Sequence, residues 1–249
     1  MAAPLPPTFG APVEYLHRFD QSLLLWLNQF AGHSAALDMA VRGIANIYLI
    51  KLGLFSAALW WLWFRREETE AGRRLVVDAI TAVVLAVAAS ILIQAVMPAR
   101  PRPLHDAGLS FVPPIGQSRD ALKNWSSFPS DNAALGFALA ATFLRASRLW
   151  GLLACLWAAL VIALPRVYLG LHYPGDVTGG ALIGMLSAFA VARLLPMGGI
   201  HRLVARVEER WRPWFYGAAF LVIYEMMVLF EDVRRAAGGA SKLLHALAG

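Results

Sequence analysis

The sequence predicts an all-α fold: a polytopic membrane protein with six transmembrane helices and an N-terminal amphipathic helix at the membrane interface. Of its 249 residues, 59% are hydrophobic and only 15% are Asp, Glu, Lys or Arg, and the mean hydropathy is +0.57. Soluble domains carry about a quarter charged residues, and disordered chains are poor in apolar residues. The composition therefore excludes both of these classes.

The first predicted element is an amphipathic helix over residues 13–31. Apolar side chains recur there at steps of three and four residues, with polar side chains between them. They are Leu16, Phe19, Leu23, Trp26, Leu27 and Phe30. This pattern is typical of a helix that lies in the plane of the membrane interface, and a short first span is the alternative.

Six apolar stretches follow, at residues 44–64, 75–97, 128–144, 149–164, 177–195 and 214–230. About 20 apolar residues cross a hydrocarbon core, and a spanning segment must satisfy its own backbone hydrogen bonds. We therefore expect six helices, the last over residues 214–230. The whole chain, residues 1–249, is expected to form one integral membrane domain.

Orientation follows from the Lys and Arg residues of the connections, because cytoplasmic loops carry an excess of them. The two sides are almost equal in this count. If Arg100, Arg102 and Arg166 belong to a functional site, they do not count toward orientation, and the other side then carries the excess of Lys and Arg. We then expect loops 98–127 and 165–175 outside the cytoplasm, with the protein in a bacterial inner (plasma) membrane and its active site on the extracytoplasmic face.

The unusual polar residues gather in three clusters within a block at residues 95–176. The clusters are Arg100-Pro101-Arg102-Pro103, then Pro129-Ser130-Asp131-Asn132, then the segment from Arg166 through His172 to Asp176. Arginines fixed by prolines suit phosphate oxygens, and a helix that opens at Ser130 attracts an anion. The spacing of His172 and Asp176 lets the carboxylate accept a bond from one imidazole nitrogen and leaves the other free to attack.

Together the three clusters resemble the signature of the type-2 phosphatidic acid phosphatase superfamily, whose members are integral-membrane lipid phosphatases and phosphotransferases. That signature reads Lys-x6-Arg-Pro, then Pro-Ser-Gly-His, then Ser-Arg-x5-His-x3-Asp. The third part matches with its full spacing, except that Pro165 stands where Ser is usual. The second part matches at Pro129 and Ser130, and the first at Arg102-Pro103.

The resemblance implies that His172 is the nucleophile, which forms a phosphohistidine, and that Asp176 orients and charges it. It implies that Arg102, Arg166 and Ser130 bind the phosphate oxygens without a metal. We expect no cofactor, since no acidic or histidine cluster has metal-ligand spacing.

Two departures from the family pattern bear directly on the chemistry. Ala95 stands where the family has Lys, and Lys123 or Arg100 is the candidate for the missing positive charge at the phosphate site. Asn132 stands where the family has the His that protonates the leaving group. An Asn side chain carries no titratable proton, and general acid catalysis contributes about 10²–10⁴-fold, so activity is in doubt unless the substrate needs no acid.

The sequence therefore predicts a membrane lipid-phosphate phosphatase that acts on a lipid diphosphate such as a polyprenyl diphosphate. A diphosphate expels a phosphate monoester, with a second pKa near 6, whereas a lipid monophosphate expels a poor alkoxide. Asp131 is a weaker candidate for a replacement acid. The alternatives are a phosphoryl transferase on the same fold and a non-catalytic lipid-phosphate binding or transport protein. The expected partner is a lipid phosphate in the bilayer, and no nucleic acid.

Two charged residues, Lys51 and Glu225, fall inside apolar stretches. Intramembrane charges are often functional. Because both lie outside the motif-bearing block, we expect them to reach the membrane edge or to pair with neighbours.

Overall fold

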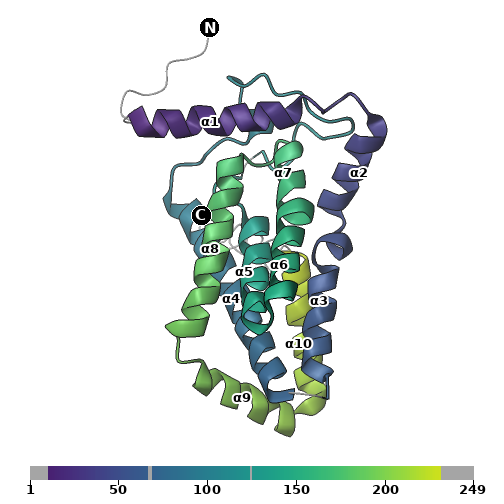
Figure 1. The fold of residues 1–249 in the computed structure, drawn as a ribbon, viewed down its shortest axis with the longest axis vertical. Coiled ribbons are helices and arrows are strands. Elements are labelled where there is room, and N and C mark those ends of the chain that lie inside the picture. The colour runs from purple at the N-terminus through teal and green to yellow at the C-terminus, as the bar shows by residue number, and fades with distance from the viewer. Residues whose placement is uncertain (1–10, 67–68, 124, 231–249) are drawn as a thin grey trace, which may run out of the picture.

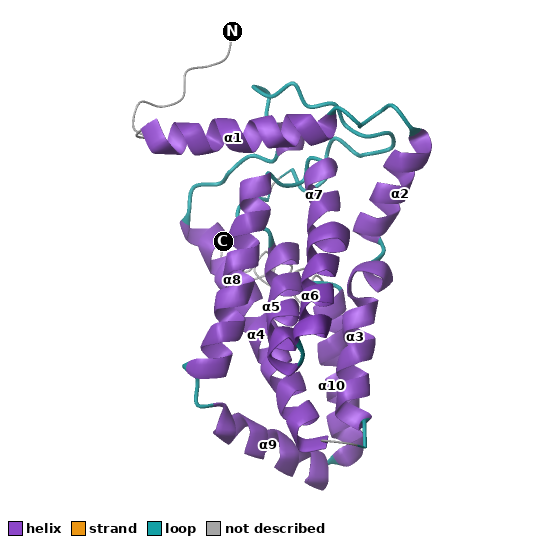
Figure 2. Cartoon of the chain, in the orientation of Figure 1, coloured by secondary structure: helices purple, strands orange, loops and turns teal. Residues whose placement is uncertain are grey.

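The computed structural model describes residues 11–66, 69–123 and 125–230, and every regular element within them is helical (Figure 2). The helices are α1 (Ala11–Asn28), α2 (Ala35–Asn46), α3 (Tyr48–Phe64), α4 (Thr69–Val96), α5 (Asp131–Ala146), α6 (Arg148–Trp157), α7 (Leu164–Tyr168), α8 (Pro174–Arg193), α9 (Met197–Arg210) and α10 (Arg212–Met227). A π-helical stretch (Ala158–Ala163) joins α6 to α7, and a 3₁₀ turn (Pro103–His105) lies in the long loop before α5. The predicted all-α class is confirmed.

The long helices form a bundle whose two ends are each crossed by a transverse helix (Figure 1). Helix α1 lies across the end where α7 finishes and α8 begins, and α9 lies across the opposite end. The sequence predicted a helix over residues 13–31, and the structure places α1 at Ala11–Asn28. The sequence did not predict α9, which was treated as a basic connection between two spans.

Three helical segments are long and apolar enough to cross a membrane, and α2 with α3 forms a bent fourth candidate. The three are Glu70–Val96, Arg148–Tyr168 and Pro174–Arg193. Helices α5 and α10 have 16 residues each, which is short for a span. The protein is thus an integral membrane protein by its helices, whereas the count of six spans stays a prediction.

The first predicted span, at residues 44–64, is interrupted in the structure. Ile47 adopts an extended conformation between α2 and α3, and the two helices meet at a bend of 44°. Gly43 and Asn46 are weak helix formers, so the chain breaks there although its hydropathy is continuous. Hydropathy alone could not show the break.

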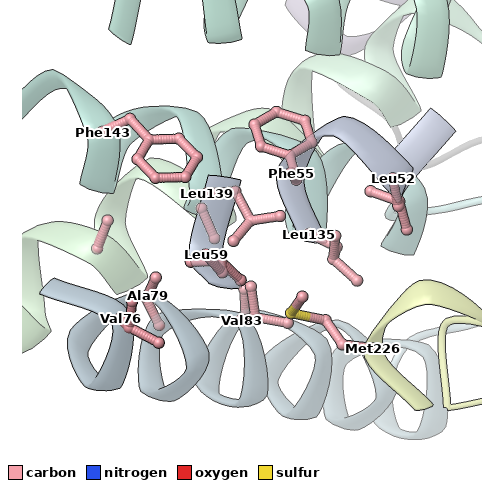
Figure 3. Packing of buried hydrophobic residues seen from close by; sticks show 14 of the residues in the cluster. Leu52, Phe55, Leu59, Val76, Ala79, Val83, Leu135, Leu139, Phe143 and Met226 are labelled. Carbon is pink, nitrogen blue, oxygen red and sulfur yellow. The ribbon is translucent and has the colours of Figure 1, made fainter. Parts of the chain in front are cut away.

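The core of the bundle is formed by apolar side chains of α3, α4, α5 and α10 (Figure 3). Leu59 of α3, Val83 of α4 and Leu139 of α5 are fully buried and converge there. Met226 reaches the same cluster from α10. This packing fixes α3 against α5, whose first residues contribute to the site described below.

Helices α5 and α8 approach closely because two glycines of α8 face the backbone of α5. A Cβ atom at Gly180 would lie 2.2 Å from the carbonyl oxygen of Ser130, and one at Gly184 would lie 2.2 Å from that of Ala134. Small residues permit such contact between membrane helices. The close approach brings the beginning of α8 to the beginning of α5.

The long loop between α4 and α5 is fixed to the first two helices by buried polar groups. The Asn28 side chain donates to the Val112 carbonyl at 2.7 Å and accepts from the Val112 N–H at 2.8 Å. The Asp38 carboxylate accepts from the Ile115 N–H at 2.8 Å. These bonds hold the loop under α1 and α2.

Candidate active site

The three polar clusters meet at the end of the bundle that α1 crosses. Helix α5 begins there with Ser130 as its N-cap, whose hydroxyl accepts from the Ala133 N–H at 3.5 Å. Helix α8 begins there with Pro174 in its first turn, and Tyr173 is its N-cap residue. The Ser130 N–H donates to the Asp176 carbonyl at 3.0 Å, which joins the two helix starts.

His172 lies in the turn between α7 and α8 and is only 1% exposed. Its Nδ1 donates to the Ser127 carbonyl at 2.7 Å, which leaves the lone pair on Nε2. Burial, and then the positive charges of Arg102 and Arg166, lower the pKa of His172 well below its usual 6.5. The imidazole is therefore neutral at neutral pH, as a nucleophile must be.

The predicted hydrogen bond from His172 to Asp176 is not present. Asp176 Oδ2 lies 3.9 Å from His172 Nδ1, which is beyond hydrogen-bonding distance. This oxygen accepts instead from the Tyr173 N–H at 2.8 Å and caps the start of α8. The predicted hydrogen bond is wrong because the Ser127 carbonyl accepts the proton of the imidazole Nδ1.

Arg100 was expected at the phosphate, and the structure places it on two carboxylates instead. Its Nη1 lies 2.6 Å from Asp176 Oδ1 and its Nη2 lies 2.7 Å from Asp20 Oδ2. Burial alone would lower the pKa of Arg100, but the two carboxylates raise it above its ordinary value. Its guanidinium also stacks over the ring of Tyr173 at 4.1 Å. Arg100 therefore links Asp176 to α1, and its guanidinium is paired with these two carboxylates.

Asp20 is a site residue that the sequence did not reveal. It lies on the buried face of α1 and, besides Arg100, accepts from the Gly175 N–H at 2.6 Å. Helix α1 is therefore bonded to the start of α8. The available signal was an acidic residue in an amphipathic helix, which is ordinarily solvent-facing.

Arg102 contacts His172 directly. Its Nη1 lies 3.3 Å from His172 Nε2, and its other hydrogen bonds go to the carbonyls of Leu171, Trp125 and Ser126. Burial and the neighbouring charge of Arg166 lower the pKa of Arg102 to about 10, so the guanidinium remains charged at neutral pH. It lies where a phosphoryl group on Nε2 would place its oxygens.

Arg166 is buried on α7, and its carbonyl accepts from the N–H groups of Leu171 and His172. Its charge acts on both His172 and Arg102. With the N-terminus of α5, whose dipole favours anions, the arrangement gathers positive charge around one imidazole nitrogen. Arg102, Arg166 and Ser130 are brought together as predicted.

Asn132 is 3% exposed and sits in the first turn of α5. Its Nδ2 donates to Asp131 Oδ1 at 3.1 Å, and its Oδ1 accepts from Lys51 Nζ at 3.4 Å. Lys51 is thus a second residue that the sequence analysis left outside the site. It was expected to reach the membrane edge or to pair with a neighbour, and the structure buries it against a motif residue.

Lys123, the other candidate for the missing charge, lies exposed in the long loop. None of the contacts described for the site involves its side chain. Ala95 is exposed near the end of α4. In the part of the chain that the structure describes, no three His, Cys, Asp or Glu side chains gather as a possible metal site; a metal-free reaction remains a prediction.

Residues 75–200, which are 126 of the 249 residues, match the family model described as the PAP2 superfamily. "Putative undecaprenyl-diphosphatase YbjG" of Escherichia coli (strain K12) is 33% identical over 159 residues, which cover 64% of this chain and 74% of that protein. "Bacitracin transport permease protein BcrC" of Bacillus licheniformis is 36% identical over 94 residues, which cover 35% and 45%.

Among solved structures, LpxE of Aquifex aeolicus resembles this chain with a TM-score of 0.52 and 26% sequence identity, over 69% of this chain and 93% of that one. The matched region contains the start of α5, the turn with His172 and all of α8. With three ordered motif clusters meeting at one end of a helical bundle, the chain belongs to the PAP2 superfamily.

Proposed function

We propose that this protein is a membrane lipid-phosphate phosphatase that acts through a phosphohistidine on His172. The observation that carries the proposal is the state of that imidazole. It is neutral, its Nδ1 proton is held by the Ser127 carbonyl, and its Nε2 lone pair lies 3.3 Å from a guanidinium N–H. A nucleophilic nitrogen beside a fixed cation is the arrangement that phosphoryl transfer requires.

In the first step, His172 Nε2 attacks phosphorus and the bond from phosphorus to the leaving oxygen breaks, with the electron pair leaving on that oxygen. Arg102, Arg166 and the N-terminus of α5 stabilise the charge on the phosphoryl oxygens. In the second step, water attacks phosphorus and the P–N bond breaks. The products are phosphate and a neutral imidazole. Asp176 positions the turn that carries His172 through its bond to the Tyr173 N–H.

The preferred substrate class is a lipid diphosphate such as a polyprenyl diphosphate. Asn132 has no proton to give, and a diphosphate expels a phosphate monoester that needs little protonation. The similarity to the Escherichia coli protein named "Putative undecaprenyl-diphosphatase YbjG" supports this class. A lipid monophosphate would expel an alkoxide and would react slowly without an acid.

The site belongs at the extracytoplasmic face of a bacterial inner membrane. Helix α1 lies across the site end of the bundle (Figure 1), and its exposed apolar side chains form a stripe suited to the interface. They are Tyr15, Phe19, Leu23 and Trp26, and Phe30 follows just after the helix ends. A lipid held at this depth presents its phosphate groups to the N-terminus of α5.

The test is a panel of lipid mono- and diphosphates given to the purified protein, read out as free phosphate and as modified lipid. A ³²P-labelled diphosphate and a rapid quench should trap an acid-labile phosphoprotein. His172→Ala should abolish both signals, by about 10⁶-fold for turnover, whereas His105→Ala in the exposed loop should keep them. Full activity in His172→Ala would eliminate the nucleophile.

The same panel separates the two other classes of function. Transfer of labelled phosphate to a second lipid or a sugar, with no free phosphate, would identify a transferase. Saturable binding of lipid diphosphate without turnover would identify a binding or transport protein, in line with the similarity to the bacitracin transport permease protein BcrC.

A further inference from the structure

Lys51 is a buried cation that the mechanism above does not use. It lies in the first turn of α3, only 2% exposed, within the bent α2–α3 pair that qualifies as a membrane span. Its Nζ lies 3.4 Å from Oδ1 of Asn132, where the family signature has its acid. The one intramembrane lysine among the described residues therefore meets the residue that stands in place of the family's acid.

The position of Lys51 is electrostatically unfavourable by itself. A charged side chain in a membrane span costs free energy, and a cation in the first turn of a helix opposes the helix dipole. Nearby, Arg102 and Arg166 add further positive charge to the same end of the bundle. A charged side chain at such a place must be stabilised by its contacts.

Those contacts hold both the backbone and the ammonium group of Lys51. The Lys51 carbonyl accepts from Trp157 Nε1 at 3.1 Å, and its Nζ lies 4.5 Å from the centre of the Tyr48 ring. The cation–π contact partly replaces lost hydration. The ammonium is thereby held against α5 at the depth of Asn132.

The contact also decides how the Asn132 carboxamide is turned. With Oδ1 directed at an ammonium, Nδ2 must point the other way, and one of its hydrogens goes to Asp131 Oδ1 at 3.1 Å. The second hydrogen remains for another acceptor. A bond to a charged donor is about twice as strong as a neutral one, so the lysine sets this orientation better than a neutral side chain would.

We propose that Lys51 is a positioning residue of the active site: its ammonium holds the oxygen of Asn132, so that the Asn132 amide presents an N–H to the bound phosphate. The pair takes the place of the histidine that the family has at position 132. The proposal rests on the function proposed above, because it assigns a role at the same phosphate site.

The experiment is a double-mutant cycle on purified protein, with kcat and KM for a lipid diphosphate and the affinity for orthovanadate measured by calorimetry. Lys51→Met removes the charge at nearly constant volume, and Asn132→Ala removes the side chain that it positions. Each should lower kcat/KM and vanadate affinity by about 10- to 100-fold. Because Lys51 acts through Asn132, kcat/KM and vanadate affinity in the double variant should lie within about 3-fold of those in either single variant.

Two further variants separate charge from structure. Lys51→Arg keeps the charge and should recover most of the loss, whereas Arg66→Met, which removes a cation from the other end of α3, should behave as wild type. If Lys51→Met does not fold, Lys51→Gln replaces it in the cycle and should lose activity in the same direction. Wild-type values in Lys51→Met, or effects that add fully in the double variant, would overturn the proposal.

The vanadate titration keeps the two proposals separate. If wild-type protein releases no phosphate from any lipid, the proposed function fails, but the dependence of vanadate binding on Lys51 still tests the positioning role. If wild-type protein releases phosphate and Lys51→Met leaves both measurements unchanged, only the positioning role fails.

Discussion

Arg102 Nη1 and His172 Nε2 lie 3.3 Å apart, with the guanidinium N–H directed at the lone pair that would attack phosphorus. The contact has two consequences. It places a cation beside the oxygens of any phosphoryl group on Nε2, and it disfavours protonation of the imidazole before substrate binds. The stabilisation of charge on the phosphoryl oxygens and the neutral state of the imidazole therefore depend on the same pair of side chains.

The first prediction concerns the pH dependence of kcat/KM. Because burial and two arginines lower the pKa of His172, the acid limb of the free enzyme should lie below pH 6.5. Arg102→Gln removes one of the charges that disfavour the imidazolium, so the pKa of His172 rises and the acid limb moves to higher pH. The move is partial, because burial, the larger cause, remains.

The measurement is the ratio of kcat/KM in Arg102→Gln to that in wild type from pH 4.5 to 8, which cancels the titration of the substrate. The plateau should fall by about 10²–10³-fold, and the ratio should fall further toward acid pH. Arg119→Gln, an exposed change in the same loop, should give a ratio near one at every pH. A ratio for Arg102→Gln that does not vary with pH would contradict the electrostatic coupling.

The second prediction concerns the link between α1 and the site. Asp20→Asn keeps an oxygen for the Gly175 N–H but removes the charge that pairs with Arg100. Arg100 then holds Asp176 less rigidly, so kcat should fall by about 3- to 30-fold while KM changes little. Ser22→Ala on the exposed face of α1 is the control. Wild-type kcat in Asp20→Asn would mean that α1 does not act on the turn that carries His172.

The third prediction concerns topology. In a Cys155→Ser background, a cysteine at Ala107 in the long loop should react with an impermeant maleimide added to intact cells. A cysteine at Ala71, at the opposite end of α4, should react only after the membrane is permeabilised. The reverse pattern would place the site on the cytoplasmic face.

Much of the fold follows from the sequence because hydropathy and motif order report directly on helices and their ends. The start of α5 at Ser130 and the start of α8 at Pro174 were readable from capping residues. The break at Ile47 was not, since it depends on weak helix propensity inside an apolar run. Helix α9 was hidden by its many arginines.

Within the site, the sequence identified the residues but not all of their partners. Asp176 and His172 lie close together but not within hydrogen-bonding distance. The imidazole donates instead to a backbone carbonyl, and backbone groups leave no trace in a residue pattern. Arg100 pairs with two carboxylates and Lys51 contacts Asn132, because long side chains reach partners that only tertiary packing defines. Asp20 and Lys51 lie far from the motifs in sequence and meet them through packing of α1 and α3.

The last prediction concerns the leaving group. If the site works without an acid because its leaving group is already a phosphate, turnover of diphosphates should greatly exceed that of monophosphates. Asn132→His should then help monophosphates most, since only an alkoxide requires a proton. General acid catalysis sets an upper expectation of about 10²–10⁴-fold.

The structure adds a condition to this expectation. Lys51 Nζ lies 3.4 Å from the side chain at position 132, and an ammonium so close disfavours the protonated imidazole that would serve as the acid. Asn132→His alone should therefore raise monophosphate turnover by less than the same change in a Lys51→Met background. The comparison is made between Lys51→Met and the double variant, so that the loss caused by Lys51→Met itself cancels.

Initial rates on a matched pair of lipid mono- and diphosphates decide the matter. Diphosphate turnover should change little when His is added in either background. An equal gain on both substrates would contradict the leaving-group argument and would favour an inactivated ancestral site, in which any acid restores activity. A cation in contact with an imidazole favours its neutral form and so reduces the fraction of imidazolium that can protonate an alkoxide. An equal gain in monophosphate turnover in both backgrounds would therefore show that the charge of Lys51 does not act on the side chain at position 132.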